Sequence, residues 1–563
     1  MITDADRTTD ADVVVIGSGP AGLTAAAYLA AAGRRVIVLE QHDLAGGNCT
    51  VFRHRGYEFD VGLHYIGDCG EGGLIPSVLA AVGLEDRITY APMDQDGFDT
   101  LVYPDVEVRV PADWDTYRQR LTLVVPDDAA GVTRCVTVLR EVAEQTRNAN
   151  IPGVETPTLD EWGMRTLDEL FVKCELSPRA RSLLDHWGGL YGSAPDAATV
   201  SMHAAIIDHY MRGAFYPVGG GQVIPARLVE VVESLGGEVR TLACVDEIMV
   251  DDGQVSGVRL AGGETITAPV VVSNADYKRT VRELVGAEHW RADTVETADE
   301  MLMTLALVVL YVVVDIDLTT GQPNTNYHVF PDWDTEGVYA ALEAGQMPDG
   351  EMWTYISMAS RKDPANTELC PPGHTNFQIM TLAPRGYGFW GVEDGPTHGP
   401  SYRRDEQYRA AKKRLTDALL TSAERALGPF RDHIVHIEMA TPLTHERYTR
   451  SSEGTSYGLQ HSPAQSGRNR PRFRTEIPGL YLTGANTVAG HGIAGTILGG
   501  AQCASTIADR PMFIEAMMGE RFVDPSILPH DGPDWDPMEV SRGAALRTVR
   551  AAGRDARAAA SGD

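Results

Sequence analysis

The chain has 563 residues, of which 43% are hydrophobic, and its 78 acidic and 48 basic residues give a formal charge of −30. This length exceeds what one hydrophobic core usually serves, so we expect two or three domains. The acidic surface repels nucleic-acid backbones and excludes nucleic acid as a partner. The seven cysteines lack CxxC or His/Cys ligand spacing, so neither a disulfide framework nor a metal site is predicted, and reduced thiols fit a cytoplasmic protein.

Residues 12–47 have the pattern of a complete dinucleotide-binding unit. An apolar strand over Val13 to Ile16 leads into a glycine-rich turn, an alanine-rich helix that ends at Ala32, and a second strand over Val36 to Leu39 that ends on Glu40. Strand, turn, helix, strand and acid stand in the order that dinucleotide binding requires. The acid is placed to accept from ribose hydroxyls and would repel a 2′-phosphate, which disfavours NADP.

The glycines of this unit have separate tasks. Gly17 permits the tight turn, Gly19 lets the backbone approach a pyrophosphate at the helix start, and Gly22 allows close packing of helix against strand. A second pair, Gly46-Gly47, follows the acid. This pair resembles the fingerprint of the large FAD-dependent oxidoreductases related to amine oxidases, in which it lets the chain pass close to the flavin's diphosphate and ribityl arm.

Five further segments carry recognisable motifs: Phe59 to Gly67, Gly219 to Gln222, Val270 to Asp276 with Thr280, Pro478 to Ala485, and Gly490 to Gly495. These motifs, which occur in the right order over most of residues 12–506, resemble those of the phytoene desaturase, carotenoid isomerase and retinol saturase group. The tetrapeptide His64-Tyr65-Ile66-Gly67 leans toward the saturase and isomerase branch. The resemblance implies that the cofactor is FAD.

The same resemblance implies the fold and the cofactor contacts. We expect an α/β fold in which a discontinuous Rossmann-like FAD-binding domain, of the amine-oxidase and phytoene-desaturase type, lies beside an α+β substrate domain. The FAD-binding domain comprises residues 10–90, 213–285 and 436–508, the substrate domain residues 91–212 and 286–435, and a C-terminal extension residues 509–563. The residues expected to contact FAD are Gly17, Gly19, Pro20, Ala21, Gly22, Glu40, Gln41, Gly46, Gly47, Asn48, His64, Val245, Asn274, Gly484, Ala485, Gly492, Ile493 and Ala494.

Two stretches between the flavin motifs have strand patterns. Val245 to Val250, Val255 to Leu260 and Thr265 to Val272 predict three short antiparallel strands joined by tight turns. Met301 to Val314 is the most hydrophobic run, but its fourteen residues fall short of the about twenty that a membrane-spanning helix needs. Its β-branched residues favour a buried strand.

Neither end of the chain carries an export signal. Residues 1–12 are polar and acidic and lack the basic start and apolar core of a signal peptide. In the basic C-terminal tail, Arg547, Arg550, Arg554 and Arg557 fall on one helical face, but the opposite face is mostly alanine. We expect a frayed or disordered tail, with a membrane-surface contact as the alternative, and a cytoplasmic protein that is at most peripheral to a membrane.

Four side chains are candidates for chemistry at a flavin, which accepts or delivers hydride at N5. His64 and Tyr65, which the resemblance places near the flavin, could supply the proton that accompanies hydride in saturating a C=C bond. Tyr457 resembles a cavity-lining position of the desaturase group. His491 begins a predicted helix whose free amides favour negative charge on reduced flavin, and its ring could add a proton or a positive charge. A purely structural role is the alternative for each.

The resemblance implies a flavoenzyme that desaturates, saturates or isomerises C=C bonds of a hydrophobic polyene or isoprenoid, such as a carotenoid or retinoid. Two alternatives stay open: a flavin amine oxidase with a small substrate, and a non-catalytic prenyl-lipid carrier of the same fold. No second glycine-rich motif follows a strand, so we expect no NAD(P)H domain. Electrons are then exchanged with an external partner such as oxygen, a quinone or a reductase, unless the reaction is a redox-neutral isomerisation.

Overall fold

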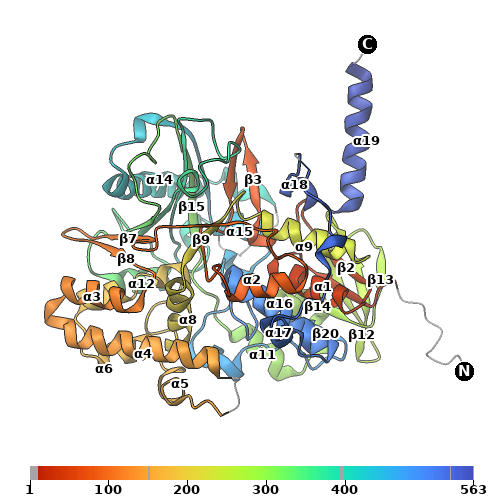
Figure 1. The fold of residues 1–563 in the computed structure, drawn as a ribbon, viewed down its shortest axis with the longest axis horizontal. Coiled ribbons are helices and arrows are strands. Elements are labelled where there is room, and N and C mark those ends of the chain that lie inside the picture. Colours follow the sequence, from red (N-terminus) through yellow and green to blue (C-terminus); the bar gives the residue numbers. More distant parts are fainter. Residues whose placement is uncertain (1–9, 150–152, 393–398, 533, 562–563) are drawn as a thin grey trace, which may run out of the picture.

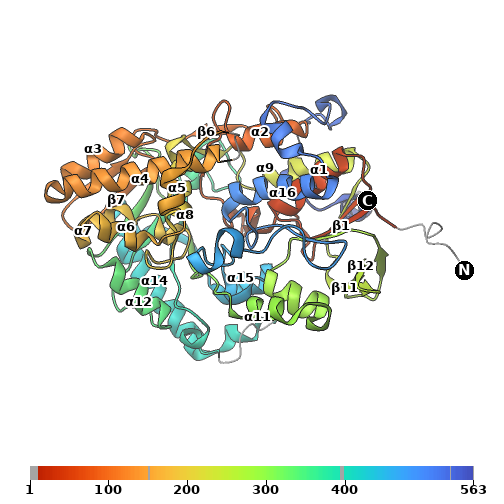
Figure 2. The same ribbon diagram turned by 90° about the horizontal axis from the view of Figure 1, so that it is seen from below.

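Two large β-sheets organise the chain, of which the computed structural model describes residues 10–149, 153–392, 399–532 and 534–561. Figures 1 and 2 show the elements of the two sheets side by side, each with its own helices. One sheet is parallel and the other is mixed. This arrangement confirms the expected α/β class.

The first sheet has five parallel strands in the order β10-β2-β1-β14-β20. Strands β1, β2 and β14 are short, mostly apolar and buried along their whole length, as expected for parallel strands covered on both faces. The order brings residues from distant parts of the chain to one sheet edge. The strands are β1 (Val13–Ile16), β2 (Val36–Leu39), β10 (Glu238–Arg240), β14 (Val271–Ser273) and β20 (Leu480–Leu482).

Helix α1 (Pro20–Ala31) packs between α9 (Val223–Ser234) and α16 (Gly492–Ala508). A Cβ at Gly500 of α16 would lie 2.4 Å from the carbonyl oxygen of Ala21, so α1 and α16 approach at backbone distance. The bounds of β1, α1 and β2 confirm the predicted strand, helix and strand of the N-terminal unit.

The predicted antiparallel meander is confirmed, with one correction. It consists of β11 (Val245–Asp251), β12 (Gln254–Leu260) and β13 (Thr265–Thr267). The third strand was expected to reach Val272, but residues 271–273 are β14 of the parallel sheet, paired with β1 and β20. Pro269, which has no N–H for a ladder hydrogen bond, separates the two strands.

The second sheet has seven strands in the order β19-β15-β18-β17-β16-β7-β8. All residues of β15 are buried, which confirms the buried strand predicted in the most hydrophobic run, although the strand begins only at Leu307. Edge strand β19 falls largely within the segment 436–508 that we assigned to FAD binding, yet it pairs with β15. The strands are β7 (Asp99–Val102), β8 (Glu107–Val110), β15 (Leu307–Val314), β16 (Asn326–Val329), β17 (Thr354–Ser357), β18 (Thr375–Leu382) and β19 (Ile434–Ala440).

Smaller elements complete the body. The hairpin β3 (Val51–His54) and β4 (Tyr57–Asp60) packs against the seven-stranded sheet through Phe52 and Phe59, whose rings contact Tyr311 of β15. A third small sheet comprises β5 (Ile66–Gly67), β6 (Tyr90–Pro92) and β9 (Ala214–Pro217). The remaining longer helices of the body are α2 (Leu74–Ala81), α3 (Trp114–Val124), α4 (Ala129–Asn148), α5 (Pro157–Trp162), α6 (Leu167–Lys173), α7 (Pro178–Leu184), α8 (Val200–Met211), α11 (Ala292–Glu300), α12 (Thr335–Glu343), α14 (Glu406–Leu427) and α15 (Pro442–Thr449).

The C-terminal extension is more ordered than predicted. After α17 (Met512–Met517), Asp531 pairs with Arg227 of α9 at 2.7 Å, and the guanidinium of Arg227 lies over the ring of Trp535. The expected frayed or disordered tail is instead α18 (Pro537–Val540) followed by α19 (Ala544–Ser561), which projects from the body in Figure 1. The side chains of Arg554 and Arg557 and all of residues 1–9 lie outside the described residues.

Within the described ranges, no helix combines the length and the apolar composition that crossing a membrane requires.

Candidate active site

A cavity of about 1060 Å³ lies between the two sheets. Ile16 and Leu39, the last residues of β1 and β2, line it on one side, and Leu307, Val309 and Tyr311 of β15 line it on the other. Ligands of open parallel sheets bind at this carboxyl edge. The cavity is lined by the predicted site residues Gly17, Gly19, Pro20, Ala21, Glu40, Gln41, Gly47, Asn48, His64, Val245, Asn274, Tyr457, Ala485, Gly492 and Ile493.

The turn between β1 and α1 depends on its glycines. Gly17 adopts a φ of +88°, and a Cβ at Gly22 would lie 2.2 Å from its carbonyl oxygen. A Cβ at Gly47 would lie 3.0 Å from Cα of Gly19, so the second glycine pair crosses the first at backbone distance. Helix α1 begins without a side-chain cap, which leaves amides of its first turn free for an anion.

Glu40 is buried and held at the end of β2 by the protein itself. Its Oε2 accepts from the amide of Ser18 at 3.0 Å and from the Ser18 hydroxyl at 2.6 Å. Its Oε1 accepts from the amide of His42 at 2.9 Å. Each carboxylate oxygen can accept more than one hydrogen bond, and Glu40 lines the cavity, so Oε1 keeps capacity for a ligand hydroxyl.

Asn274 joins the two glycine segments that lie far apart in the sequence. Its Nδ2 donates to the carbonyl of Gly17 at 3.2 Å. On the other side, a Cβ at Gly484 would lie 2.4 Å from its Oδ1, and Gly484 has a φ of +93°. The N-terminal turn and the loop after β20 therefore form one continuous wall.

A buried arginine organises the loop that leads into α16. Arg470 donates to the carbonyl oxygens of Ala485 at 2.8 Å, Thr487 at 2.8 Å and Leu459 at 3.0 Å. Burial lowers the pKa of Arg470 to about 9, which leaves it protonated at neutral pH. Helix α16 begins after His491 without a side-chain cap, and Gly492 and Ile493 of its first turn line the cavity. Its free amides favour negative charge in the cavity.

His491 is the residue that directly precedes helix α16. Its ring packs against Tyr457 and His461 with centroids 5.1 and 4.9 Å apart, and Nε2 of each histidine lacks a hydrogen-bond partner among the described residues. Burial and the charge of Arg470 lower the pKa of His491 to about 3. The ring is therefore neutral, so it does not supply the positive charge that we considered from the sequence.

His64 lies above a buried cluster of polar side chains. Its Nδ1 lies 3.2 Å from Oε1 of Gln378, and its carbonyl oxygen accepts from Nζ of Lys362 at 2.6 Å. Lys362 also donates to Oδ1 of Asn326 at 2.5 Å and to the hydroxyl of Ser357 at 2.7 Å. Burial, and then the charge of Lys362, lower the pKa of His64 to about 3. At neutral pH the ring is uncharged, with one N–H and one acceptor nitrogen.

Two carboxylates balance the charge of Lys362. Burial lowers the pKa of Lys362 to about 7, although Asp99 and Asp60 oppose this shift. Asp60 accepts from the amide of Gly221 at 2.8 Å and from the hydroxyl of Tyr216 at 2.5 Å, yet burial raises its pKa to about 6. This cluster joins the parallel-sheet side of the molecule to the seven-stranded sheet beneath His64.

Tyr65 does not line the cavity. Its hydroxyl donates to Oδ2 of Asp99 at 3.1 Å, and its ring stacks on Tyr210 with centroids 4.2 Å apart. Burial raises its pKa well above the ordinary range, so the hydroxyl stays protonated and engaged. The predicted site residues outside the cavity lining are Gly22, Gly46, Gly484, Ala494, Tyr65 and His491.

Several residues of the site were missed from the sequence. Lys362, Asp99, Gln378 and Arg470 occur in no recognised motif, whereas Asp60 lies within the matching segment Phe59 to Gly67 but was given no role there. Folding alone brings the five side chains into the site. No local pattern could have found them, because a charged residue in a loop or strand usually marks the solvent side.

The backbone cradle fits a dinucleotide cofactor. The crowded glycine turn, the uncapped start of α1 and the held carboxylate of Glu40 match the pyrophosphate and ribose ends of such a molecule. The second uncapped helix start, at α16, faces the same cavity, as a flavin that gains negative charge on reduction requires. Fold and site together define a flavin-dependent oxidoreductase.

Comparisons with known proteins agree with this class. The model of the flavin-containing amine oxidoreductase family matches residues 20–297. All-trans-retinol 13,14-reductase of Rattus norvegicus is 28% identical over 540 residues, covering 89% of this chain and 86% of the relative. Prolycopene isomerase 1, chloroplastic, of an Oncidium hybrid cultivar is 26% identical over 522 residues, covering 88% and 84%.

A solved structure shows the same fold. Putrescine oxidase bound to putrescine superposes with a TM-score of 0.59 at 14% identity, over 89% of this chain and 99% of that one. The chain is an FAD-dependent oxidoreductase that is similar to the flavin-containing amine oxidoreductases, the retinol 13,14-reductases and the prolycopene isomerases. Its cofactor is FAD.

Proposed function

We propose that the protein saturates, desaturates or isomerises C=C bonds of a hydrophobic polyene of the retinoid or carotenoid class. The cavity carries this proposal, because it continues from the cofactor cradle past His64 to apolar and aromatic side chains of the seven-stranded sheet. Leu307, Val309, Tyr311 and Met439 line that part. An extended apolar ligand buries its surface there while one of its double bonds faces the cradle. The names of the retinol reductase and prolycopene isomerase relatives support this substrate class.

The roles of the site residues follow from their positions. The predicted contacts that line the cavity hold FAD, which supplies hydride acceptance or delivery when bound. His64 lines the cavity, but a pKa of about 3 leaves almost none of its ring protonated at neutral pH, so its proposed role is to hydrogen-bond the substrate or the flavin. Tyr457 lines the same cavity and orients the substrate. The amides at the start of α16 stabilise negative charge that develops nearby.

We further propose that the domains follow the cofactor motifs, with residues 10–90, 213–285 and 436–508 holding FAD and residues 91–212 and 286–435 holding the substrate. Limited proteolysis of the FAD-loaded protein tests this division. Cleavage within residues 286–435 should leave the flavin bound, whereas cleavage within residues 213–285 should release it. Release of flavin by both classes of cleavage would overturn the division.

Substrate and reaction are tested in one experiment. The purified protein is incubated anaerobically with retinoids, carotenoids, polyunsaturated acyl compounds and primary amines, while flavin absorbance and product mass are followed. A polyene that changes the flavin spectrum with a product two mass units heavier or lighter identifies saturation or desaturation. An unchanged mass with altered retention identifies isomerisation. Turnover of amines alone would overturn the proposal in favour of an amine oxidase.

The electron partner is proposed to be external. The described residues contain one five-stranded parallel sheet, and its cradle serves FAD, so a quinone, oxygen or a reductase exchanges electrons with the flavin. Stopped-flow mixing of the reduced protein with oxygen, with a quinone analogue and with NADPH identifies the partner. Reoxidation by oxygen or quinone is expected. Fast reduction of the oxidised protein by NADPH alone would contradict it.

A membrane surface is proposed as the place where the substrate enters. Strand β19, beside the cavity, carries the exposed side chains Val435 and Ile437, and the cations Arg403, Arg409 and Lys412 line the cavity. Apolar and cationic groups together favour an anionic lipid surface. Co-sedimentation with phosphatidylglycerol vesicles should exceed that with phosphatidylcholine vesicles and fall in Val435→Ser/Ile437→Ser. Equal sedimentation in all three cases would rule the contact out.

A further inference from the structure

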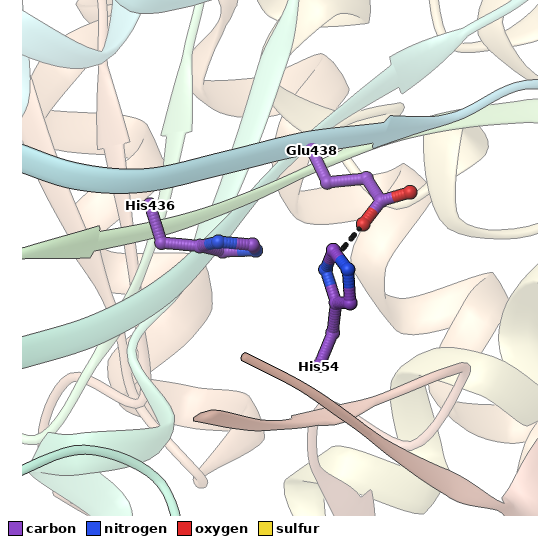
Figure 3. Close-up of side chains that lie close together, drawn as sticks. All are labelled: His54, His436 and Glu438. Carbon is purple, nitrogen blue, oxygen red and sulfur yellow. Dashed lines mark ion pairs between the residues drawn. The ribbon is translucent and has the colours of Figure 1, made fainter. Parts of the chain in front are cut away.

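Three side chains with metal-binding atoms meet at the rim of the cavity, outside the flavin site. His54 lies at the tip of hairpin β3–β4, and His436 and Glu438 lie on edge strand β19. Residues two apart on a strand point to the same face, so His436 and Glu438 both face the hairpin. Figure 3 shows the two side chains projecting from β19 toward His54. One ligand atom from each lies within 4.8 Å of those of the other two.

The three groups leave binding capacity unused. His436 is 5% exposed, and its Nε2 has no hydrogen-bond partner among the described residues. Such an orphaned nitrogen is costly unless a ligand engages it. Nδ1 of His54 lies 2.8 Å from Oε2 of Glu438, an ion pair that lacks hydrogen-bond geometry.

The surroundings fix the position of the buried ligand. The ring of His436 packs against Tyr57 and Phe59 of β4, with centroids 5.4 Å from each. His54 and Glu438 are less buried and are free to adjust to an ion. A rigid ligand and two adjustable ones permit closure to metal–ligand distances of about 2.0–2.2 Å.

We propose that His54, His436 and Glu438 bind a divalent transition-metal ion, with Zn²⁺ as the best match. Two imidazoles and one carboxylate are a zinc donor set that leaves the fourth position open. His54 and Glu438 both line the cavity, so the open position faces it and accepts an oxygen ligand such as a substrate hydroxyl or water. The ion joins the hairpin to the edge of the seven-stranded sheet and fixes this wall of the cavity. Nearby Lys412 and Arg55 weaken binding by repulsion, so affinity is below that of a four-ligand structural site.

The test uses the full FAD-loaded chain without a histidine tag, stripped with a chelator. It is titrated with ZnCl₂ in a calorimeter, and bound zinc is counted by elemental analysis after desalting. We expect one saturable equivalent per chain. Glu438→Gln and His54→Ala should each weaken binding by more than about 100-fold, since even groups outside the coordination sphere contribute about 10- to 100-fold. The Glu438 side chain is exposed and glutamine has nearly the same shape as glutamate, so Glu438→Gln should not disturb the fold.

A matched control is available where β15 ends and β19 begins. His433 and Asp315 form another histidine–carboxylate pair, 2.9 Å apart and similarly exposed. His433→Ala should bind zinc as the unaltered chain does. Absence of a saturable equivalent, persistence of binding in both Glu438→Gln and His54→Ala, or equal loss in His433→Ala would each overturn the proposal. Flavin content of the same samples reports separately on the cofactor site.

Discussion

The two sides of the cavity are built from different materials. The cofactor side is mainly backbone, with glycines at positions such as Gly22 and Gly47 where a Cβ meets neighbouring backbone within 2.2 and 3.0 Å. The wall beneath His64 is a set of side chains, in which Lys362 binds three acceptors and lies among buried carboxylates. The backbone side of the cavity is disrupted when a side chain is added to one of its glycines. The side-chain side is disrupted when one member of the cluster is removed. The first disruption should cost the cofactor, and the second should cost stability.

The substitution expected to disrupt the cofactor side most is Gly22→Val. Its Cβ would overlap the carbonyl of Gly17, so the turn cannot close on a pyrophosphate. We expect complete loss of bound FAD, measured as the flavin-to-protein absorbance ratio, with the circular dichroism of a folded chain. Gly262→Ala, in a turn where a Cβ meets nothing within 4 Å, should keep full flavin occupancy. Flavin retained in Gly22→Val would contradict the cradle.

The corresponding substitution in the side-chain wall beneath His64 is Lys362→Met. It removes the donor to His64, Asn326 and Ser357 and leaves the carboxylates of Asp60 and Asp99 without their cation. Breaking a buried charge cluster costs about 3–5 kcal/mol of unfolding free energy. Urea denaturation of the FAD-free protein measures this loss without a contribution from cofactor binding. A loss of about 0.5 kcal/mol or less, the range of ordinary surface substitutions, would show that the cluster does not support the wall.

His64 connects the two sides of the cavity. It lines the cavity and its carbonyl oxygen accepts from Lys362, so His64→Leu should lower turnover by about 10-fold through loss of a hydrogen bond to the substrate or the flavin. His445→Leu replaces another histidine of the cavity lining and should leave turnover near that of the unaltered chain. Equal losses in both variants would mean that any histidine lining the cavity has this effect by packing alone.

The pH dependence of stability separates the two sides again. Since the pKa of Lys362 falls from an ordinary 10.5 to about 7 in the folded chain, the unfolded chain binds more protons between these values. Lys362 therefore contributes stability that is present above pH 10.5 and is lost as the pH falls through about 7. From pH 7 to 9 the stability of the unaltered chain should rise relative to Lys362→Met, by at most about 1.4 kcal/mol per pH unit. A difference in unfolding free energy between the two proteins that stays constant from pH 7 to 9 would show that Lys362 does not titrate near pH 7 in the folded chain.

The smallest effect is expected from Tyr65→Phe. Tyr65 donates to Asp99 but does not line the cavity, so its hydroxyl should contribute about 1 kcal/mol to stability and nothing direct to turnover. Thermal denaturation and steady-state kinetics measure the two quantities. A large loss of turnover at full stability would restore Tyr65 as a proton donor.

The sequence predicts the strand, helix and strand around the glycine turn well and the buried polar side chains around Lys362 poorly. Short-range patterns specify the strand, turn and helix around Gly17, and β15 was recognisable as an unbroken apolar strand. The end of the third meander strand was misplaced, because pairing of residues 271–273 with β1 and β20 depends on tertiary structure. Lys362 and Arg470 escaped notice for the same reason, since their burial follows from contacts with distant segments.

The order of strands in the parallel sheet has a consequence for biosynthesis. β20 completes that sheet, and α16, which packs on α1, follows it near the end of the chain. While the ribosome translates the preceding residues, the N-terminal unit waits with its apolar helix uncovered, a state that favours aggregation and engagement of chaperones. Flavin loading therefore comes late in synthesis, and a protein truncated before Leu480 should emerge colourless even though its glycine fingerprint is intact.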